Sequence, residues 1–421
     1  MKKLLFLAAN YPPYMIDGAA RAFSIASTLP AHGWQPVVIA PPDLCPPLEA
    51  KGGERGQVIR RTAGAVDAAG LEHDALASFL RGGKMPGRSV AARVLPRLFS
   101  QPHPLSTWKK EAGRLADELI QAEGGIEGIY VQGPPAAPVK LALDLSKKHS
   151  LPVLFDLTAP LDPPLNPSAA SGMKPADLQG LEERVLTSGF PVITPTRALK
   201  EHFLKKHIGR AAHNDISIIP DIVLSLPSGS SARGVAFRPV IFLDTIEPDA
   251  MRFFFSSLAA FLQGPLADGR LASIVVVTPE MDLAAKLVGK FRIKEAVELR
   301  SSATAAEEAE LALGADVVGV VCGSAEHCRL RVPEVLVTAV GLRKPVFVLG
   351  TDGAAKQFAL ESNGMDLSGG GESAPRELLQ ACYERWREGT LSASNTAMPA
   401  RCQPERVFGD LARIIAFMLP V

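Results

Sequence analysis

The chain has 421 residues, of which 47% are hydrophobic, and this is enough for two domains that each form a core. The 45 lysines and arginines nearly balance the 44 aspartates and glutamates, so the net charge of +1 gives no reason to expect a nucleic-acid partner. The five cysteines are scattered and lack the spacing of a zinc site, which favours reduced, buried thiols in a cytoplasmic protein. No apolar stretch approaches the length of a membrane span.

The first half of the chain alternates short apolar runs with segments of helical pattern. The expected strands lie at 3–9, 36–40, 128–132, 152–156, 190–194 and 215–220. The expected helices between them lie at 19–31, 109–123, 136–149, 175–188 and 197–207. The runs are continuously hydrophobic, which is typical of a parallel sheet with helices on both faces. The run at 3–9 is too short for the hydrophobic segment of a signal peptide and is explained better as a buried strand.

The second half repeats the alternation after a stretch rich in Ser, Gly and Pro, 224–237, which is the best linker candidate. Its expected strands lie at 239–244, 273–278, 296–300, 316–322 and 345–350. We therefore expect an α/β fold with two doubly wound Rossmann-like domains that face a cleft, residues 1–222 and 223–403. Ligands of such folds bind at the carboxyl ends of the strands.

The turn after the first strand, NYPPYMIDGAARAF (10–23), belongs to that ligand edge. Asp17-Gly18 can adopt a positive φ and leaves amides at the start of the next helix. Arg21, in the first helical turn, opposes the helix dipole unless an anion lies beside it. A contact with a bound anion and a surface ion pair with Asp17 are both open. The turn lacks the G-x-G-x-x-G pattern, so a nicotinamide dehydrogenase is not supported.

Six segments of the sequence occur in an order that matches the motif order of a known protein family. They are FLAANYPPYMIDGAARAFSIASTLPAHGWQPVVIAP (6–41), QPHPLSTW (101–108), IYVQGPPAAPVKLALDLSKKHSLPVLFDLTAP (129–160), ITPTRALKEHFLKKH (193–207), ALGADVVGVV (312–321) and VPEVLVTAVGLRKPVFVLGTDGAAKQF (332–358). In this order they resemble the retaining, nucleotide-sugar-dependent glycosyltransferases of family 4, which have the GT-B fold. The resemblance covers nearly the whole chain and includes the final helix, 404–421, which in this fold crosses back to the N-terminal domain.

The resemblance implies a nucleotide-diphosphate sugar in the C-terminal domain and a saccharide or lipid-linked acceptor on the N-terminal side. It implies neither a cofactor nor a metal. The acceptor-side candidates are Asp17, Gly18, Arg21 and His103, the last of which replaces the Asp of a Pro-Asp element. The catalytic candidates are Asp156 and Glu334, the latter one residue before a position that is often Lys in a subgroup of the family.

Seven residues are candidates for binding the donor: Arg329, Arg331, Thr338, Arg343, Lys344, Asp352 and Gly353. The loop HCRLRVPE (327–334) offers two arginines to a diphosphate, although a solvated basic loop is the alternative. The segment GTDGAAKQF (350–358) supplies backbone amides at a helix start, a general anion-binding feature. Thr338 stands where the family holds the donor with a Glu.

Other positions depart from the family pattern. Thr278-Pro279-Glu280 replaces its Gly-x-Gly, and the carboxylates Asp244, Glu247 and Asp249 stand near its diphosphate-binding cations. Three carboxylates there would repel a diphosphate unless a metal ion lay between them. Two hypotheses follow: an active glycosyltransferase, and a GT-B protein without transfer activity that serves as a partner, scaffold or sugar-nucleotide sensor. Convergence of the arginines and Lys344 on the 353–358 helix start favours the first, and the carboxylates at that point favour the second.

Residues 76–110 contain seven basic residues and no acidic one. In the subgroup that acts on lipid-linked saccharides, this region lies near the acceptor mouth. A basic amphipathic segment can bind anionic lipid at about 1 kcal/mol per cation, whereas a mobile basic loop is the alternative. We therefore expect a cytoplasmic protein and leave open a peripheral contact with a membrane.

Overall fold

The structure is a computed structural model, which describes residues 2–11, 18–40, 58–61, 104–122, 125–161, 175–223, 226–227, 235–244, 246–263, 271–301, 305–365, 375–391 and 396–418. They form two compact units. Unit 1 comprises Met1–Pro220 and Pro404–Val421, and unit 2 comprises Asp221–Gln403. The expected linker, 224–237, and the basic segment, 76–110, lie mostly outside the described residues.

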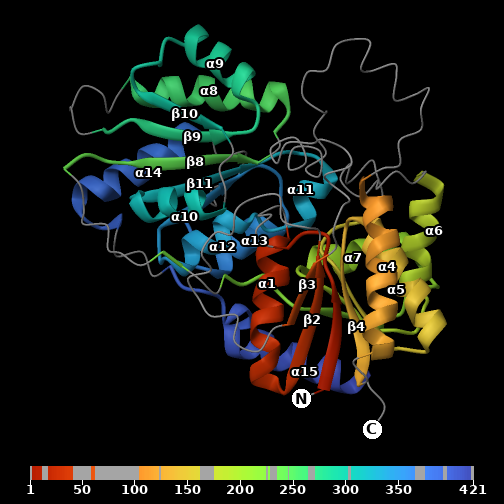
Figure 1. The fold of residues 1–421 in the computed structure, drawn as a ribbon. Helices are drawn as coiled ribbons and strands as arrows, with labels where there is room; N and C mark the ends of the chain where they lie inside the picture. The colour runs from red at the N-terminus through yellow and green to blue at the C-terminus, as the bar shows by residue number, and fades with distance from the viewer. Residues whose placement is uncertain are drawn as a thin grey trace. The chain divides into compact units, whose positions relative to one another are not determined.

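Unit 1 contains a parallel sheet of seven strands in the order β3-β2-β1-β4-β5-β6-β7 (Figure 1). Its strands are β1 Lys2–Leu7, β2 Trp34–Ala40, β3 Val58–Arg61, β4 Ile126–Gly133, β5 Val153–Leu157, β6 Val192–Thr194 and β7 Ile216–Ile218. Because every neighbouring pair is parallel, all carboxyl ends lie at one edge. The strand order reverses between β1 and β4, which makes this pair the topological switch point of the sheet.

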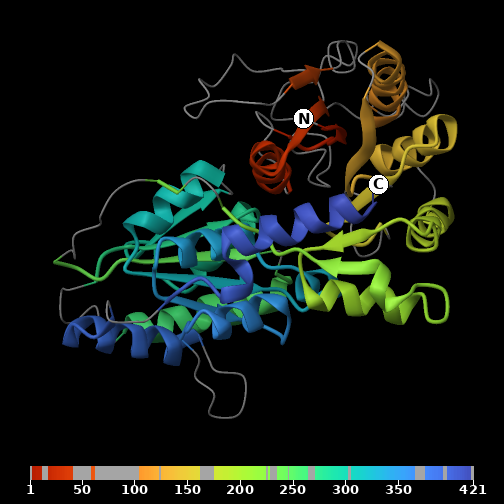
Figure 2. The ribbon, with the colours of Figure 1, turned by 90° about the horizontal axis from the view of Figure 1, so that it is seen from below.

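The helices of unit 1 connect and flank these strands. They are α1 Ala19–Thr28, the 3-10 helix η1 Leu29–His32, α4 Pro104–Ala122, α5 Ala136–His149, α6 Pro175–Leu186, α7 Arg197–Lys206, the 3-10 helix η4 His213–Asp215 and α15 Pro404–Met418. Helices α4 and α5 lie side by side (Figure 1). The last helix, α15, buries Val407, Phe408, Leu411 and Ile415, whose spacing forms one face, and it packs on η1 and β5 (Figure 2).

A buried carboxylate connects three parts of unit 1. Glu182, in α6, accepts hydrogen bonds from His207 at 2.9 Å and from the backbone N–H of Leu161 at 2.8 Å, and its carboxylate pairs with Lys206 at 2.8 Å. Burial by itself would raise the pKa of Glu182, but the bonds from His207, Lys206 and Leu161 outweigh it and hold the pKa below its ordinary value. The ionised carboxylate therefore fixes the chain that leaves β5 to α6 and to the end of α7.

Unit 2 contains a parallel sheet of five strands in the order β10-β9-β8-β11-β12. The strands are β8 Pro239–Asp244, β9 Ile274–Thr278, β10 Val297–Ser301, β11 Val317–Cys322 and β12 Val346–Leu349. The helices are α8 Pro248–Leu262, α9 Met281–Lys290, α10 Ala305–Gly314, α11 Glu326–Leu330, α12 Glu334–Gly341, α13 Ala354–Glu361, α14 Pro375–Glu388 and the 3-10 helix η7 Ala400–Cys402. Here the order reverses between β8 and β11.

Both faces of the unit 2 sheet are buried. In β8, Ile241 and Leu243 join one core with residues of α8, α9 and α14, whereas Val240 and Phe242 join a second core with residues of α10, α12 and α13. Alternate side chains of a strand point to opposite faces, so a strand covered on both sides must be apolar at every position. This is the physical reason for the continuous hydrophobic runs in the sequence.

The prediction of a doubly wound α/β fold is confirmed, and each strand expected from an apolar run is present. The edge strand β3 was not predicted. Cys322, Cys328, Cys382 and Cys402 are buried thiols, as expected, and Cys45 lies outside the described residues. Among the helices described, none combines the length and the apolar character needed to cross a membrane.

Candidate functional site

The switch point of unit 2 brings together two strand ends that are far apart in the sequence. Asp244 ends β8 and Cys322 ends β11, and the two residues are partners in the parallel register. In doubly wound sheets, ligands bind at the carboxyl edge beside such a switch point. The loops that follow β8, β11 and β12 therefore define the candidate site of this unit.

An ion pair lies at this switch point. Arg331, just after α11, donates from Nη2 to Oδ1 of Asp244. The side chains are 31% and 16% exposed respectively. The second carboxylate oxygen of Asp244, Oδ2, is buried and accepts no hydrogen bond within the described part of the chain. The arginine predicted to bind a diphosphate is thus neutralised by one of the carboxylates predicted to oppose it.

A second carboxylate of the loop after β8 is also engaged by the protein. Glu247 accepts hydrogen bonds from the backbone N–H of Ser324, at 3.1 and 3.2 Å to its two oxygens, and from the Ser324 hydroxyl at 2.7 Å. Burial by itself would raise the pKa of Glu247, but these bonds and those from nearby backbone amides outweigh it, and the pKa lies below its ordinary value. This carboxylate anchors the loop after β11. The third, Asp249, is exposed and pairs with Arg252 at 2.7 Å.

The thiols and the imidazole of this edge are uncharged at neutral pH. Burial, and then the charge of Asp244, raises the pKa of Cys322 to about 12 and that of Cys328 to about 11. Burial, and then the charge of Arg331, lowers the pKa of His327. A nucleophilic thiolate is therefore not available here. Within the described ranges, no three His, Cys, Asp or Glu side chains are grouped as a metal site requires.

The turn between β12 and α13 packs tightly against the loop after β11. Gly350 has φ +120°, and a Cβ there would lie 2.3 Å from the carbonyl oxygen of Cys322. A Cβ on Gly353 would lie 2.8 Å from the backbone of Arg329. Arg329 itself donates from Nε to the carbonyl of Asp352 at 3.1 Å, and it pairs with no carboxylate in the described part of the chain. The start of α13 thus lies beside an exposed guanidinium.

Two further candidates lie on α12. Glu334 is its first residue and is half-buried, and an acidic residue in the first turn of a helix is favoured by the helix dipole. Thr338 lies one turn further on and is buried in the run Val335–Val340. The structure therefore places Glu334 near the carboxyl edge and Thr338 inside the packed part of the helix.

Arg343 and Lys344 do not lie at this edge, contrary to the expectation. Both precede β12, whose first residue is Val346, so they belong to the amino ends of the parallel strands. Lys344 donates from Nζ to the carbonyl of Ala315, which precedes β11, at 2.9 Å. Four residues of β12 separate the two edges by about 13 Å. The four cations therefore do not converge on the start of α13, the arrangement that would favour the active enzyme, because proximity to Arg331 in sequence does not place a residue at the same edge of the sheet.

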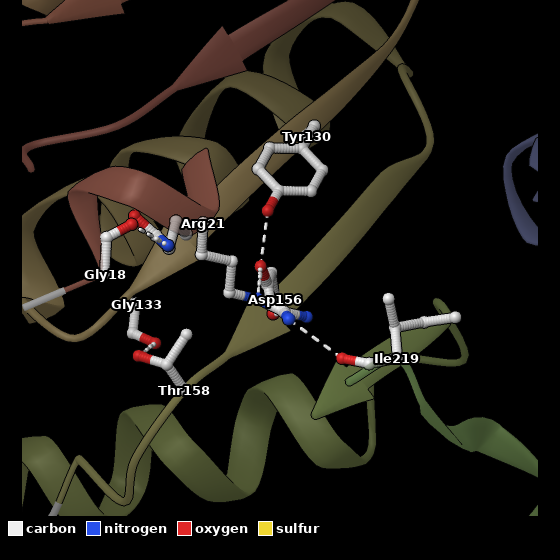
Figure 3. Close-up of polar contacts among 8 residues, drawn as sticks. Gly18, Arg21, Tyr130, Gly133, Asp156, Thr158 and Ile219 are labelled. Atoms are coloured by element: carbon white, nitrogen blue, oxygen red, sulfur yellow. Dashed lines mark hydrogen bonds and ion pairs between the residues drawn. The ribbon is translucent and has the colours of Figure 1, made fainter. Parts of the chain in front are cut away.

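In unit 1, Arg21 and Asp156 form a buried ion pair (Figure 3). Arg21 donates from Nε to Oδ2 at 2.7 Å and from Nη2 to Oδ1 at 3.0 Å, and from Nη1 to the carbonyl of Ile219 at 2.8 Å. Tyr130 donates its hydroxyl to Asp156 Oδ2. The side chains of Arg21 and Asp156 are 5% and 0% exposed. Within the described residues, the anion beside Arg21 is thus a protein carboxylate, Asp156, whereas the proposed pair with Asp17 concerns a residue outside them.

This pairing also changes the interpretation of Asp156. A fully buried carboxylate with three donated hydrogen bonds supports the structure and is not placed to act as a base on an acceptor. Around it, Gly18 has φ +87° and its carbonyl accepts a hydrogen bond from Gln132 at 2.9 Å. Thr158 donates its hydroxyl to the carbonyl of Gly133 at 3.3 Å (Figure 3), and its backbone N–H donates to the same carbonyl at 2.8 Å.

Sequence reasoning missed Tyr130 and Gln132, which reach these contacts from the run GIYVQ. Two polar side chains within an otherwise apolar buried strand were the available signal, because buried polar groups need partners. Ser324 was also missed, since a serine in a loop carries no pattern of its own. Asp17 and His103, the other acceptor-side candidates, lie outside the described residues.

No protein-family model matches the sequence, and neither does any curated protein. Solved structures resemble it along nearly its full length. A glycosyltransferase from Rickettsia africae has a TM-score of 0.57 at 12% identity, with 99% of this chain and 98% of that chain covered. HepE from Anabaena, solved with UDP-glucose, has a TM-score of 0.58 at 16% identity, with 99% and 100% covered. The UDP-GlcNAc 2-epimerase from Methanocaldococcus jannaschii has a TM-score of 0.54 at 11% identity, with 99% of each chain covered.

At these identities the likeness concerns the fold. The narrower resemblance to the retaining family 4 stays a prediction. Two doubly wound parallel sheets, together with the likeness to these solved structures along nearly the whole chain, give this chain the GT-B fold of glycosyltransferases.

Proposed function

We propose that this chain binds a nucleotide-diphosphate sugar at the carboxyl edge of the unit 2 sheet and transfers the sugar to a saccharide or lipid-linked acceptor bound by unit 1. The observation that carries the proposal is the position of Arg331 at the switch point between β8 and β11, with Arg329 beside the start of α13. Guanidinium groups and the free amides of a helix start are the donors that a diphosphate requires.

The proposed transfer needs no covalent step from the protein beyond positioning and charge stabilisation. Sugar transfer breaks the bond between the anomeric carbon and the diphosphate, and negative charge develops on the leaving phosphate oxygen. Cations and amide dipoles that are already in place stabilise that charge, and the loss of one such donor typically costs about 3–4 kcal/mol of transition-state stabilisation. In this assignment, Arg329 and Arg331 stabilise the leaving group. Glu334 is the carboxylate candidate that remains, since Asp156 is paired with Arg21.

Two solved structures support the choice of ligand. HepE is bound to UDP-glucose, and the archaeal protein is a UDP-GlcNAc 2-epimerase. Both names refer to nucleotide sugars, and both chains share this fold at low identity. The proposed transfer changes no oxidation state, so it needs no redox cofactor.

Isothermal titration with UDP, GDP, ADP and their glucose or mannose derivatives tests the binding step. We expect micromolar affinity for at least one nucleotide and a loss of about 10- to 100-fold in Arg331→Ala or Arg329→Ala, because charge-assisted bonds are worth about 1.5–3 kcal/mol each. Arg343→Ala is the matched control, since this exposed arginine lies at the opposite edge and should leave the affinity unchanged. Binding to none of the nucleotides would refute the proposal.

The second measurement separates transfer from other outcomes. The nucleotide sugar that binds is incubated with and without mixed saccharide and lipid-linked acceptors, and the products are identified by mass spectrometry. Acceptor-dependent release of the nucleoside diphosphate supports transfer. Conversion of the sugar without any acceptor would indicate an epimerase, and binding without turnover would indicate the GT-B partner or sensor.

A further inference from the structure

The arginine best placed to bind a diphosphate is occupied by the protein itself. Arg331 donates a hydrogen bond to Oδ1 of Asp244, whereas Oδ2 is buried and accepts no hydrogen bond within the described residues. The carboxylate is thus incompletely satisfied, which makes this pair weaker than a bidentate one. A pair of this kind can be opened by an anion that offers the arginine more contacts.

Three other carboxylates near this edge are engaged by other groups. Glu247 accepts its hydrogen bonds from Ser324. Asp249 is exposed on α8 and pairs with Arg252. Asp352 pairs with Lys356 at 2.9 Å. Asp244, by contrast, pairs with Arg331 itself, the cation that we assign to the diphosphate.

We propose that Asp244 is an internal counter-ion that occupies Arg331 in the empty site and is displaced by the diphosphate of the ligand. This inference rests on the proposed function, since it concerns the same edge of the sheet. A diphosphate has two phosphate groups, so one can take the place of Asp244 on Arg331 while the other reaches Arg329 and the start of α13. After sugar transfer, the return of Asp244 to Arg331 promotes release of the diphosphate product.

Displacing a carboxylate costs affinity in two ways. The ligand must replace the existing ion pair, and its negative charge must then lie near a carboxylate of the same sign. Removal of the charge of Asp244 should therefore tighten the binding of a diphosphate, whereas the loss of an ordinary binding residue weakens it. The sign of the effect distinguishes a counter-ion from a residue that binds the ligand directly, for example by accepting a sugar hydroxyl at Oδ2.

The test compares Asp244→Asn with the wild-type chain by isothermal titration with UDP and with inorganic pyrophosphate, which has no base. We expect the dissociation constants to fall about tenfold for both probes. Asp249→Asn is the control, because it makes the same change in net charge at an exposed position of α8. It should change affinity less than twofold. Asp244→Ala serves if the asparagine variant does not give the wild-type circular dichroism spectrum.

A thermodynamic cycle with Arg331→Ala identifies the mechanism. The gain from Asp244→Asn should disappear when Arg331 is absent, because the carboxylate then has no cation to occupy. Unchanged or weaker binding by both Asp244 variants, or a gain that persists without Arg331, would overturn the inference.

The two proposals fail in different ways. If the wild-type chain binds UDP and the Asp244 variants do not tighten it, the counter-ion inference fails and the proposed function stands. If pyrophosphate binding tightens as expected but no nucleotide binds to either chain, the counter-ion inference stands and the nucleotide-sugar proposal fails. Absence of any binding overturns both.

Discussion

The buried ion pair of unit 1 gives the most quantitative prediction. Replacement of Asp156 by Asn removes the charge that neutralises Arg21, whose side chain is 5% exposed, and replacement of Arg21 by Met leaves a buried carboxylate that keeps only the Tyr130 hydroxyl among its named donors. Breaking a buried pair from one side typically costs about 3–5 kcal/mol, because the remaining charge is desolvated without compensation. The methionine variant also leaves the Ile219 carbonyl without its donor.

The expected loss is large enough to measure for unit 1 alone. At about 2–4 °C per kcal/mol for a domain of this size, either single variant should lower the Tm of unit 1 by about 6–20 °C. Trp34 and Trp108 are buried in unit 1 and Trp386 is in unit 2. Fluorescence-detected unfolding in a Trp386→Phe background therefore reports on unit 1 specifically.

The double variant, Arg21→Met with Asp156→Asn, separates the pair from its surroundings. It should lose clearly less stability than the sum of the two single variants, with a coupling of about 2 kcal/mol or more, since both uncompensated charges are then gone. Arg197 and Glu201 provide the exposed comparison, at 72% and 45% exposure, and Arg197→Met should cost less than about 0.5 kcal/mol. Additive single losses, or losses as small as that of the control, would refute the reasoning.

Three further predictions follow from individual contacts. Gly350→Ala should destabilise unit 2 by about 2 kcal/mol or more in urea unfolding, because Gly350 has a positive φ and the new Cβ would lie 2.3 Å from the Cys322 carbonyl oxygen. Gly289→Ala, where the added Cβ meets open space, should be neutral or stabilising, and equal effects of the two substitutions would contradict the prediction. The stability that Glu182 contributes should be fully present above its unfolded pKa of 4.5 and be lost as the pH falls through its lower folded pKa. The difference in unfolding free energy between the wild-type chain and Glu182→Gln should therefore shrink between pH 7 and pH 3. A difference that grows on acidification would refute this. Cys322 and Cys328, with pKa values of about 12 and 11, should resist alkylation by iodoacetamide at pH 8 in the native chain and react in urea. Mass spectrometry follows the labelling, and rapid labelling of the native chain would contradict the prediction.

The strands could be read from the sequence because their signal is local. A strand covered by helices on both faces must be apolar at each position, so runs such as PVIFLD and VVGVVC mark β8 and β11 without any knowledge of their neighbours. Strand β3 was not predicted, because it lies at the sheet edge beside β2 and two of the four residues of its sequence, VIRR, are charged. The fold class follows from the alternation of such runs with helices, and the solved structures agree with it.

The partners of the charged residues could not be read in this way. Asp244 and Arg331 are 87 positions apart, and Arg21 and Asp156 are 135 apart, so neither pair has a sequence spacing that would reveal it. Arg343 is close to Arg331 in sequence, yet the two residues lie at opposite edges of the sheet. By itself, the sequence determined which buried segments are strands and that they form doubly wound parallel sheets. Only the tertiary structure decided which cation meets which anion there, because strand order and register, not chain proximity, bring charges together.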